Sequence, residues 1–314
     1  MAHRLTNHQG THFLEPGNKI LKELLEPRLL LKEKQACDSS FSDFDDVKYN
    51  VSVSKEEPHL VRISLAMRDL SKLMILTPDI QPSGYLGALY PGPACQLQEP
   101  PSGYSICLEV NIDLLPADDP AGAEALVKRI SELKRNLLAG PMERAISAML
   151  EGVSNSQKLE RIQYRRNESM WVKPEADRVY VIYDVAFTDP ADQVIARSFL
   201  QEFQHSSQKV NGAPFTTYST EPPVELRGER IQQHPTCVGY IRFAVLEQHL
   251  IGEERRAKTV SSLVGFRNYL HYHIKASRTY LHIRMRRRVQ SLLQILQRAV
   301  QNPLIEGASS SGKK

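Results

Sequence analysis

The sequence has few cysteines and no long run of apolar residues. Cys37, Cys95, Cys107 and Cys237 are scattered along the 314 residues, and no C-x-x-C pair occurs. Such scatter argues against a disulfide framework and favours reduced thiols. No segment approaches the roughly 18 consecutive apolar residues of a membrane-spanning helix, and residues 1–16 lack the apolar region of a signal peptide. We therefore expect a soluble cytoplasmic chain without membrane insertion.

The sequence also lacks the common sequence motifs of enzyme active sites. The sequence contains no G-x-S-x-G elbow and no H-E-x-x-H pair. The stretch GASSSGKK, residues 307–314, comes close to a phosphate-binding loop, but Lys314 stands where that loop needs Ser or Thr. His3, His8 and His12 lie in a polar stretch with no helical pattern to bring them together. The sequence therefore predicts no enzyme, no cofactor and no metal site.

Acidic residues are missing from one long segment. Residues 255–305 contain eleven Lys and Arg and no Asp or Glu, whereas the whole chain has a formal charge of only +4. The rest of the chain is therefore net acidic, and the basic character is local. Its centre is RNYLHYHIKASRTYLHIRMRRR, residues 267–288, where seven Lys and Arg and three His alternate with tyrosines and aliphatic residues. An uncompensated excess of this kind favours contact with an acidic partner surface.

The rest of the sequence falls into two halves that show a similar succession of strand and helix patterns. Residues 18–33 have helical apolar spacing interrupted at Pro27, and strand patterns then occupy 41–55, 61–67 and 104–110. A helix over 119–150 follows, with a break expected near Gly140–Pro141. The second half has strand patterns at 160–166, 169–174, 178–187 and 237–246, and a mixed strand and helix pattern at 194–206.

The intervening segments are predicted as loops. Residues 83–104 are dense in Gly and Pro, and residues 207–236 are polar and contain proline. Three acidic residues that crowd one short stretch are expected at a turn or facing solvent: Asp43, Asp45 and Asp46.

These patterns predict an α+β fold of two similar domains. Each domain is expected to be an antiparallel sheet packed with helices, and the chain is expected to end in a long C-terminal helix. The predicted bounds are a flexible leader at 1–15, a first domain at 16–153, a second domain with the long helix at 154–305, and a disordered tail at 306–314.

The C-terminal helix is predicted over residues 254–301, which contain no proline and a single glycine. At 1.5 Å per residue it extends ~70 Å, further than either half-domain. Winding at about 100° per residue brings six apolar residues into one strip: Leu263, Leu270, Ile274, Leu281, Met285 and Leu292. Phe266, Tyr269 and Tyr280 fall on the opposite side. We therefore expect this helix to pack both on its own sheet and on a partner protein.

A basic stripe is predicted between these two apolar sides. The same winding places six residues within about 100° of one another: Arg267, His271, Lys275, Arg278, His282 and Arg286. Arg284, Arg287 and Arg288 extend the stripe round the helix. No acidic residue stands four positions away to neutralise these charges, so we expect the stripe to be exposed and to meet an acidic surface.

Two alternatives exist for this stripe. One is a solvated face with no partner. The other is binding to nucleic acid, because a basic run followed by Leu292, Leu293 and Leu296 is similar to a basic-region zipper. Against the zipper, no strict heptad of leucines follows, and the basic residues mix with the apolar strip instead of preceding it.

The same segments resemble a known protein family, that of subunit 2 of the actin-related protein 2/3 complex. FRNYLHYHIKASRTYLHIRMRRR at 266–288 fits the family pattern in register, and shorter matches are FSDFDDVKY at 41–49, YRRNESMWV at 164–172 and EPPVEL at 221–226. The resemblance covers nearly the whole folded chain. It implies a non-catalytic scaffold and actin-filament-binding subunit that supports nucleation of branched actin filaments, located in the cytoplasm and the cytoskeleton.

The resemblance also implies partners and residue roles. The implied partners are subunit 4 in a heterodimer core, the actin-related subunits 2 and 3, and the mother actin filament. The apolar strip defined above, from Leu263 to Leu292, is then partner or core surface, and we assign it as the seam with the partner helix. Actin or another acidic surface is expected to contact Lys275, Arg278, His282, Arg284, Arg286, Arg287 and Arg288. A basic-helix nucleic-acid-binding protein remains the alternative.

Overall fold

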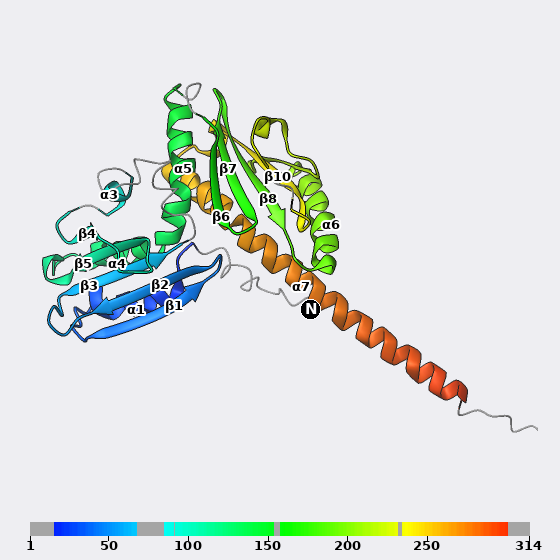
Figure 1. The fold of residues 1–314 in the computed structure, drawn as a ribbon, viewed down its shortest axis with the longest axis horizontal. Helices are drawn as coiled ribbons and strands as arrows, with labels where there is room; N and C mark the ends of the chain where they lie inside the picture. Colours follow the sequence, from blue (N-terminus) through cyan, green and yellow to red (C-terminus); the bar gives the residue numbers. More distant parts are fainter. Residues whose placement is uncertain (1–15, 68–84, 91, 154–157, 232–233, 301–314) are drawn as a thin grey trace, which may run out of the picture.

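Two five-stranded antiparallel sheets of the same topology form the fold (Figure 1). The computed structural model describes residues 16–67, 85–90, 92–153, 158–231 and 234–300. The strand order is β1-β2-β3-β5-β4 in the first sheet and β6-β7-β8-β10-β9 in the second. The predicted α+β class, the repeat of two similar units and the long C-terminal helix are thereby confirmed. The leader histidines and the phosphate-loop-like tail lie outside the described residues.

The first unit consists of one sheet and the helices that precede and follow it. Its elements are α1 Lys19–Leu29, β1 Cys37–Asp43, β2 Val47–Val53, β3 Leu60–Ala66, α3 Tyr85–Leu89, β4 Cys95–Gln98, β5 Ile106–Asn111, the short 3-10 helix η2 Ile112–Leu114, α4 Pro120–Ser131 and α5 Leu133–Leu150.

The second unit repeats the sheet and ends in the longest helix. Its elements are β6 Glu160–Arg165, β7 Glu168–Pro174, β8 Arg178–Ala186, α6 Pro190–Ser207, β9 Phe215–Ser219, η4 Val224–Leu226, β10 Cys237–Leu246, η5 Glu247–His249 and α7 Glu253–Val300.

Residues 41–55, predicted as strand, contain a tight hairpin. Asp45 and Asp46 connect β1 to β2 with φ values of 69° and 57°, a left-handed conformation that Asp adopts more readily than most residues. In β2 every second residue is buried, which is the alternation expected of a strand with one face on a core. The predicted turn at these aspartates is confirmed, but Asp45 is buried and forms ion pairs with Lys134 and Arg165, both 3.0 Å long.

One apolar core runs through both units. It contains residues of both sheets together with residues of α1, α4, α5, α6 and α7. Although α5 precedes the second sheet in the chain, it contacts β7 and β8, and Figure 1 shows it between the two sheets. This helix therefore joins the two units. In the described part of the chain, no helix is both long and apolar enough to span a bilayer.

Two helix boundaries differ from the prediction. Helix α1 continues through Pro27 to Leu29, and the break expected at Gly140–Pro141 lies instead at Glu132, between α4 and α5. The chain can leave the helix there because the free carbonyl groups find partners. The Ser131 hydroxyl donates to the Lys128 carbonyl oxygen at 2.6 Å, and the Asn18 backbone N–H donates to the Ser131 carbonyl oxygen at 2.9 Å.

Three further segments, two in the second unit and one in the first, also differ from the prediction. Residues 194–206, predicted as mixed strand and helix, lie entirely within α6. Asp189 caps this helix by accepting a 2.8 Å hydrogen bond from the Ala191 N–H, and Pro190 occupies the first turn. The predicted loops at 83–104 and 207–236 contain the edge strands β4 and β9, which are too short for a clear alternation.

A half-buried carboxyl group in the second sheet, that of Asp184, makes the stability of the fold depend on pH in a specific range. Burial raises the pKa of Asp184 to about 8, and its carboxylate accepts a hydrogen bond from the Ser169 N–H. An aspartate in an unfolded chain has a pKa of about 3.9. Between these values the folded state holds a proton that the unfolded state has lost, so the free energy of unfolding falls as pH rises from about 4 to 8.

We expect Asp184→Asn to flatten this dependence, because the amide does not titrate. Melting temperatures measured at pH 5 and pH 8 should differ less for the variant than for the parent chain. The matched control is Asp177→Asn: this exposed carboxyl has its pKa lowered by Arg178, so it titrates below the window and should leave the slope unchanged. Equal slopes for Asp184→Asn and the parent chain would rule out Asp184 as the source.

Candidate protein-interaction helix

The first half of α7 is anchored in the core of its own chain. Phe266 packs in an aromatic cluster with Tyr183, Phe203 and Phe243, with ring centroids 4.9 to 5.8 Å from its own. The Tyr183 hydroxyl donates a 2.7 Å hydrogen bond to the carbonyl oxygen of Leu263. Buried in the same core are Leu263, Leu270 and Ile274. These three members of the predicted partner seam pack against their own chain, which corrects the expectation of one continuous partner-facing strip.

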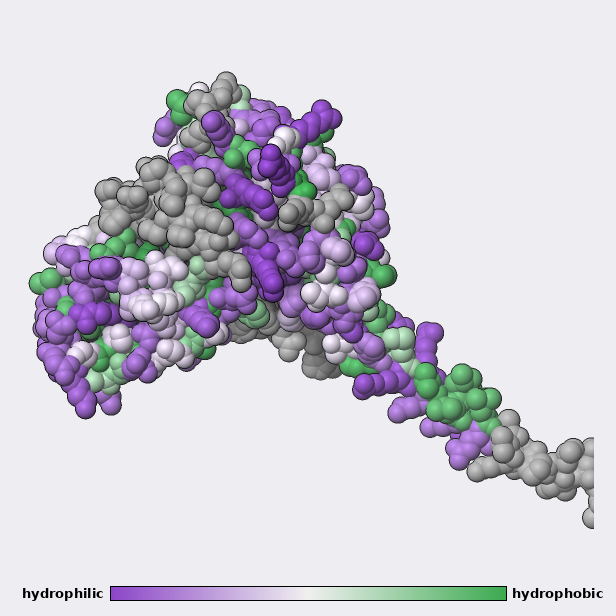
Figure 2. All heavy atoms as spheres, in the orientation of Figure 1, coloured by the Kyte–Doolittle hydropathy of each residue, from purple (hydrophilic) through white to green (hydrophobic). Residues whose placement is uncertain are grey.

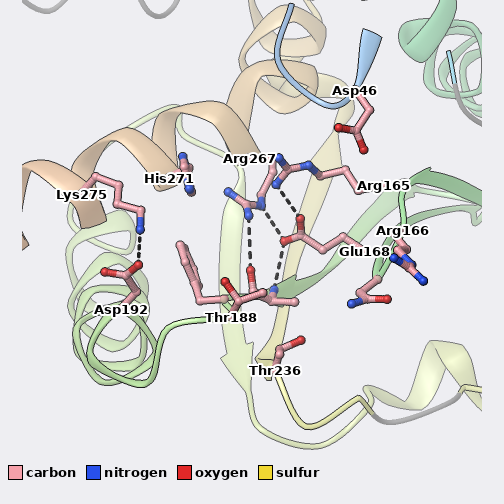
Figure 3. A pocket seen from close by; sticks show the side chains of 13 residues that line it. Asp46, Arg165, Arg166, Glu168, Thr188, Asp192, Thr236, Arg267, His271 and Lys275 are labelled. Atoms are coloured by element: carbon pink, nitrogen blue, oxygen red, sulfur yellow. Dashed lines mark hydrogen bonds and ion pairs between the residues drawn. The ribbon is translucent and has the colours of Figure 1, made fainter. Parts of the chain in front are cut away.

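Arg267 is buried instead of exposed. Its relative exposure is 4%, and its Nε atom donates to Glu168 Oε1 at 2.5 Å. Glu168 begins β7 and also accepts from the Ala186 N–H at 3.0 Å and pairs with Arg165 at 3.0 Å (Figure 3). The predicted stripe fails here because the neutralising acid comes from another element, which a count of charges along one helix does not include.

The next cations of the predicted stripe are also paired within the chain. Lys275 forms an ion pair with Asp192 of α6 (Figure 3). Arg278 contacts Asp189 at 2.6 Å and Asp192 at 3.0 Å. The prediction that these charges lack acidic partners is therefore wrong for Lys275 and Arg278. Their contact with an outside acidic surface stays a prediction.

The second half of α7 leaves the body of the protein. From residue 279 to residue 298 every side chain is exposed, and at 1.5 Å per residue this segment rises roughly 30 Å. Figure 1 shows it projecting alone beyond the second sheet, and Figure 2 shows hydrophobic surface gathered near its end. We call residues 279–298 the distal segment.

The distal segment carries an apolar face that the structure leaves uncovered. Winding at about 100° per residue places five apolar residues within about 80° of one another. These residues, here called the distal face, are Leu281, Met285, Val289, Leu292 and Leu296. Each is exposed, with relative exposures from 46% to 56%. Three of them belong to the predicted seam, whereas Val289 and Leu296 were missed. The spacings from Met285 to Val289, Leu292 and Leu296 are four, three and four residues, and this helical spacing is the signal that would have found them.

Cations flank the distal face on both sides. On the same winding, Arg284 and Arg288 lie along one edge and His282 and Arg286 along the other, while Arg287 lies on the far side. Arg284 also stacks over the ring of Tyr280, 5.6 Å from its centroid. Among the described residues, none of these five side chains has an ion pair with an acid. Their charge therefore remains available to a partner.

The described residues offer little for catalysis. They contain no group of three or more His, Cys, Asp or Glu arranged to hold a metal ion. The four cysteines are free thiols, and burial raises the pKa of Cys95 to about 12, which disfavours the reactive thiolate. The distal segment is suited to binding another protein. Its apolar face can be buried against a partner, and the charges at the edges of that face can pair with charges of the partner.

The fold and the distal segment define a two-unit α+β protein whose last helix extends past its own core with an uncovered amphipathic surface. The family described as "Arp2/3 complex, 34 kD subunit p34-Arc" matches residues 77–303. The chain belongs to this family.

Curated relatives agree with this assignment. The chain is 31% identical over 319 residues to a Schizosaccharomyces pombe protein named "Actin-related protein 2/3 complex subunit 2", covering 96% of this chain and 98% of that one. It is 33% identical over 298 residues to a Dictyostelium discoideum protein of the same name, covering 93% and 94% respectively. The resemblance drawn from the sequence motifs is thereby confirmed.

Proposed function

We propose that the chain is a non-catalytic scaffold subunit of the Arp2/3 complex, located at the cytoplasmic actin cytoskeleton. The single observation that carries this proposal is the distal face, whose apolar side chains are exposed over a little more than four turns of helix. A soluble protein rarely leaves such a surface without a partner. The names of the relatives describe them as subunits of a complex. Another subunit of such a complex would cover the distal face.

The partner proposed for the distal face is a helix of subunit 4. A helix is favoured because the distal face is narrow and follows the spacing of side chains that interlock with a second helix. Together the two subunits would form the core that positions the actin-related subunits 2 and 3. The pairing of Lys275 and Arg278 with α6 supports this division of roles, since it fixes the root of the projecting helix to the second unit.

The cations at the edges of the distal face are proposed to meet the mother actin filament or an acidic neighbour. Arg286, Arg287 and Arg288 lie on successive sides of the helix, so a partner helix on the distal face leaves some of them in contact with a third surface. Exposed charge pairs of this kind are screened by salt and mainly affect association rate and specificity.

Charge reversal tests the filament contact. Complex carrying Arg286→Glu, Arg287→Glu and Arg288→Glu should co-sediment with actin filaments about tenfold more weakly at low salt, and the difference should shrink as salt is raised. The control is a triple reversal with the same change in net charge at exposed lysines of the first unit, Lys22, Lys34 and Lys48. Equal binding by the two triple variants would remove the distal arginines from the filament interface.

The same proteins test the nucleic-acid alternative. A basic-helix nucleic-acid binder should bind any duplex, with a slope of about 0.9 log units of affinity per log unit of salt for each phosphate contact. We expect no such binding by the assembled complex. Duplex binding that is lost in the distal triple variant, together with unchanged filament binding, would favour the alternative.

A further inference from the structure

A polar cleft lies where three of the sequence motifs meet. Its volume is about 280 Å³. Asp46 of the β1–β2 turn, residues 165–168 of the β6–β7 turn, and Arg267, His271 and Lys275 of α7 line it (Figure 3). The contacts proposed for the distal segment, with subunit 4 and with the filament, use none of this surface.

The cleft contains a buried cationic donor with no partner. Arg267 uses Nε for Glu168 and Nη2 for the Ala186 carbonyl oxygen, the latter at 3.3 Å. Its Nη1 atom is buried and has no hydrogen-bond partner among the described residues. Buried polar groups are nearly always hydrogen-bonded, and an unsatisfied charged donor is costly. The free Nη1 therefore marks a position that favours an acceptor from outside the chain.

Four cations and three acids line the cleft, so its formal charge is slightly positive, and two of the acids are each shared by two cations. Glu168 is shared by Arg165 and Arg267, and Asp192 is shared by Lys275 and Arg278. Asp46 is the remaining acid of the lining, whereas Arg166 is an exposed cation with no ion pair among the described residues. Burial lowers the pKa of His271, and the charges of Arg267, Arg165 and Lys275 lower it further.

We propose that this cleft is a binding site for a phosphate-type oxyanion, with Arg267 Nη1 as the central donor and Arg166 at the rim. Lys275, the Thr188 hydroxyl and the Asn167 amide are the further donors of the lining. Donors that converge from three elements match the several oxygens of a phosphate better than the two of a carboxylate. Because Asp46 comes from the first unit and the cations from the second, a bound phosphate group sits at the contact between the units.

Titration of the full-length chain with inorganic phosphate tests this site. Isothermal titration calorimetry at constant ionic strength should show saturable binding to the parent chain and weaker binding of acetate. Arg267→Lys keeps a cation beside Glu168 but removes the Nη1 donor, and Arg166→Gln removes an exposed cation without disturbing the core. Each variant should weaken phosphate binding about tenfold, the effect of losing one charge-assisted hydrogen bond.

The matched control is Arg284→Gln, which removes a cation from the distal segment and should bind phosphate like the parent chain. Circular dichroism checks that the Arg267→Lys variant keeps its fold. If that variant does not fold, phosphate binding by Arg166→Gln alone tests the proposal. Three results would overturn the proposal: no saturation with phosphate, equal affinity of the parent chain and Arg166→Gln, or saturable binding of acetate alone.

Discussion

Replacing Met285 and Leu292 by aspartate is expected to abolish assembly with subunit 4. Both side chains lie on the distal face and are more than half exposed in the free chain, at 53% and 56%. The substitutions should therefore leave the chain folded. In the proposed interface each aspartate would carry a buried charge, which costs several kcal/mol per ion. At 1.4 kcal/mol per tenfold change in affinity, the double variant should bind subunit 4 at least a hundredfold more weakly.

The far side of the same helix supplies the control. Ile283 is 43% exposed and lies opposite the distal face on the helical winding. Ile283→Asp introduces the same charged side chain about two and a half turns beyond Ile274, the last buried residue among the described side chains of α7, and this variant should co-purify with subunit 4 as the parent chain does. Affinity capture of tagged subunit 4 from co-expressing cells makes the comparison. Retention of the Met285→Asp, Leu292→Asp variant would show that the distal face is not the seam.

Removing the Glu168 carboxylate is expected to be the most destabilising single change at the root of α7. The Glu168→Ala variant leaves Arg267 buried without its counter-ion and leaves the Ala186 N–H without its acceptor. Breaking a buried pair by deleting one partner costs about 3–5 kcal/mol. The free energy of unfolding measured by denaturant titration, and the melting temperature, should both fall accordingly.

A partly exposed ion pair at the end of β7 gives the comparison for that loss of stability. Glu175 pairs with Lys173 at 3.1 Å, and both side chains are about one-third exposed. Glu175→Ala should cost at most ~1 kcal/mol, as exposed pairs do. If Glu168→Ala and Glu175→Ala were equally mild, the buried pair would not be what holds α7 to β7.

Much of the fold was predictable because its main elements have regular patterns. The alternation in residues 47–53 and the strand pattern of 178–186 indicate strands of a sheet, and the lack of proline in residues 254–301 permits one long helix. Edge strands β4 and β9 were missed since four or five residues next to Gly and Pro give no usable period. The helix boundary at Glu132 depends on a hydrogen bond from Asn18, more than a hundred residues away, which no local pattern records.

The candidate site was predictable in part for the same reason. Periodicity placed Leu281, Met285 and Leu292 on one side of the helix, as the distal face requires. It did not show that Leu270 and Ile274 on the same strip are buried in the chain's own core, because the point where α7 leaves the body depends on the size of the second sheet and α6. Nor did it reveal that Arg267 and Lys275 are neutralised, since Glu168 and Asp192 lie 99 and 83 residues away.

The central claim, that the distal segment is a partner-covered helix, is tested most directly by hydrogen–deuterium exchange. Peptides spanning residues 279–298 would be followed in the full-length chain alone and in its co-expressed complex with subunit 4. An exposed terminal helix opens readily, whereas a packed one exchanges only through rarer openings. The account predicts strong new protection of residues 281–296 in the complex. Exchange of this segment at the same rate in both samples would contradict it.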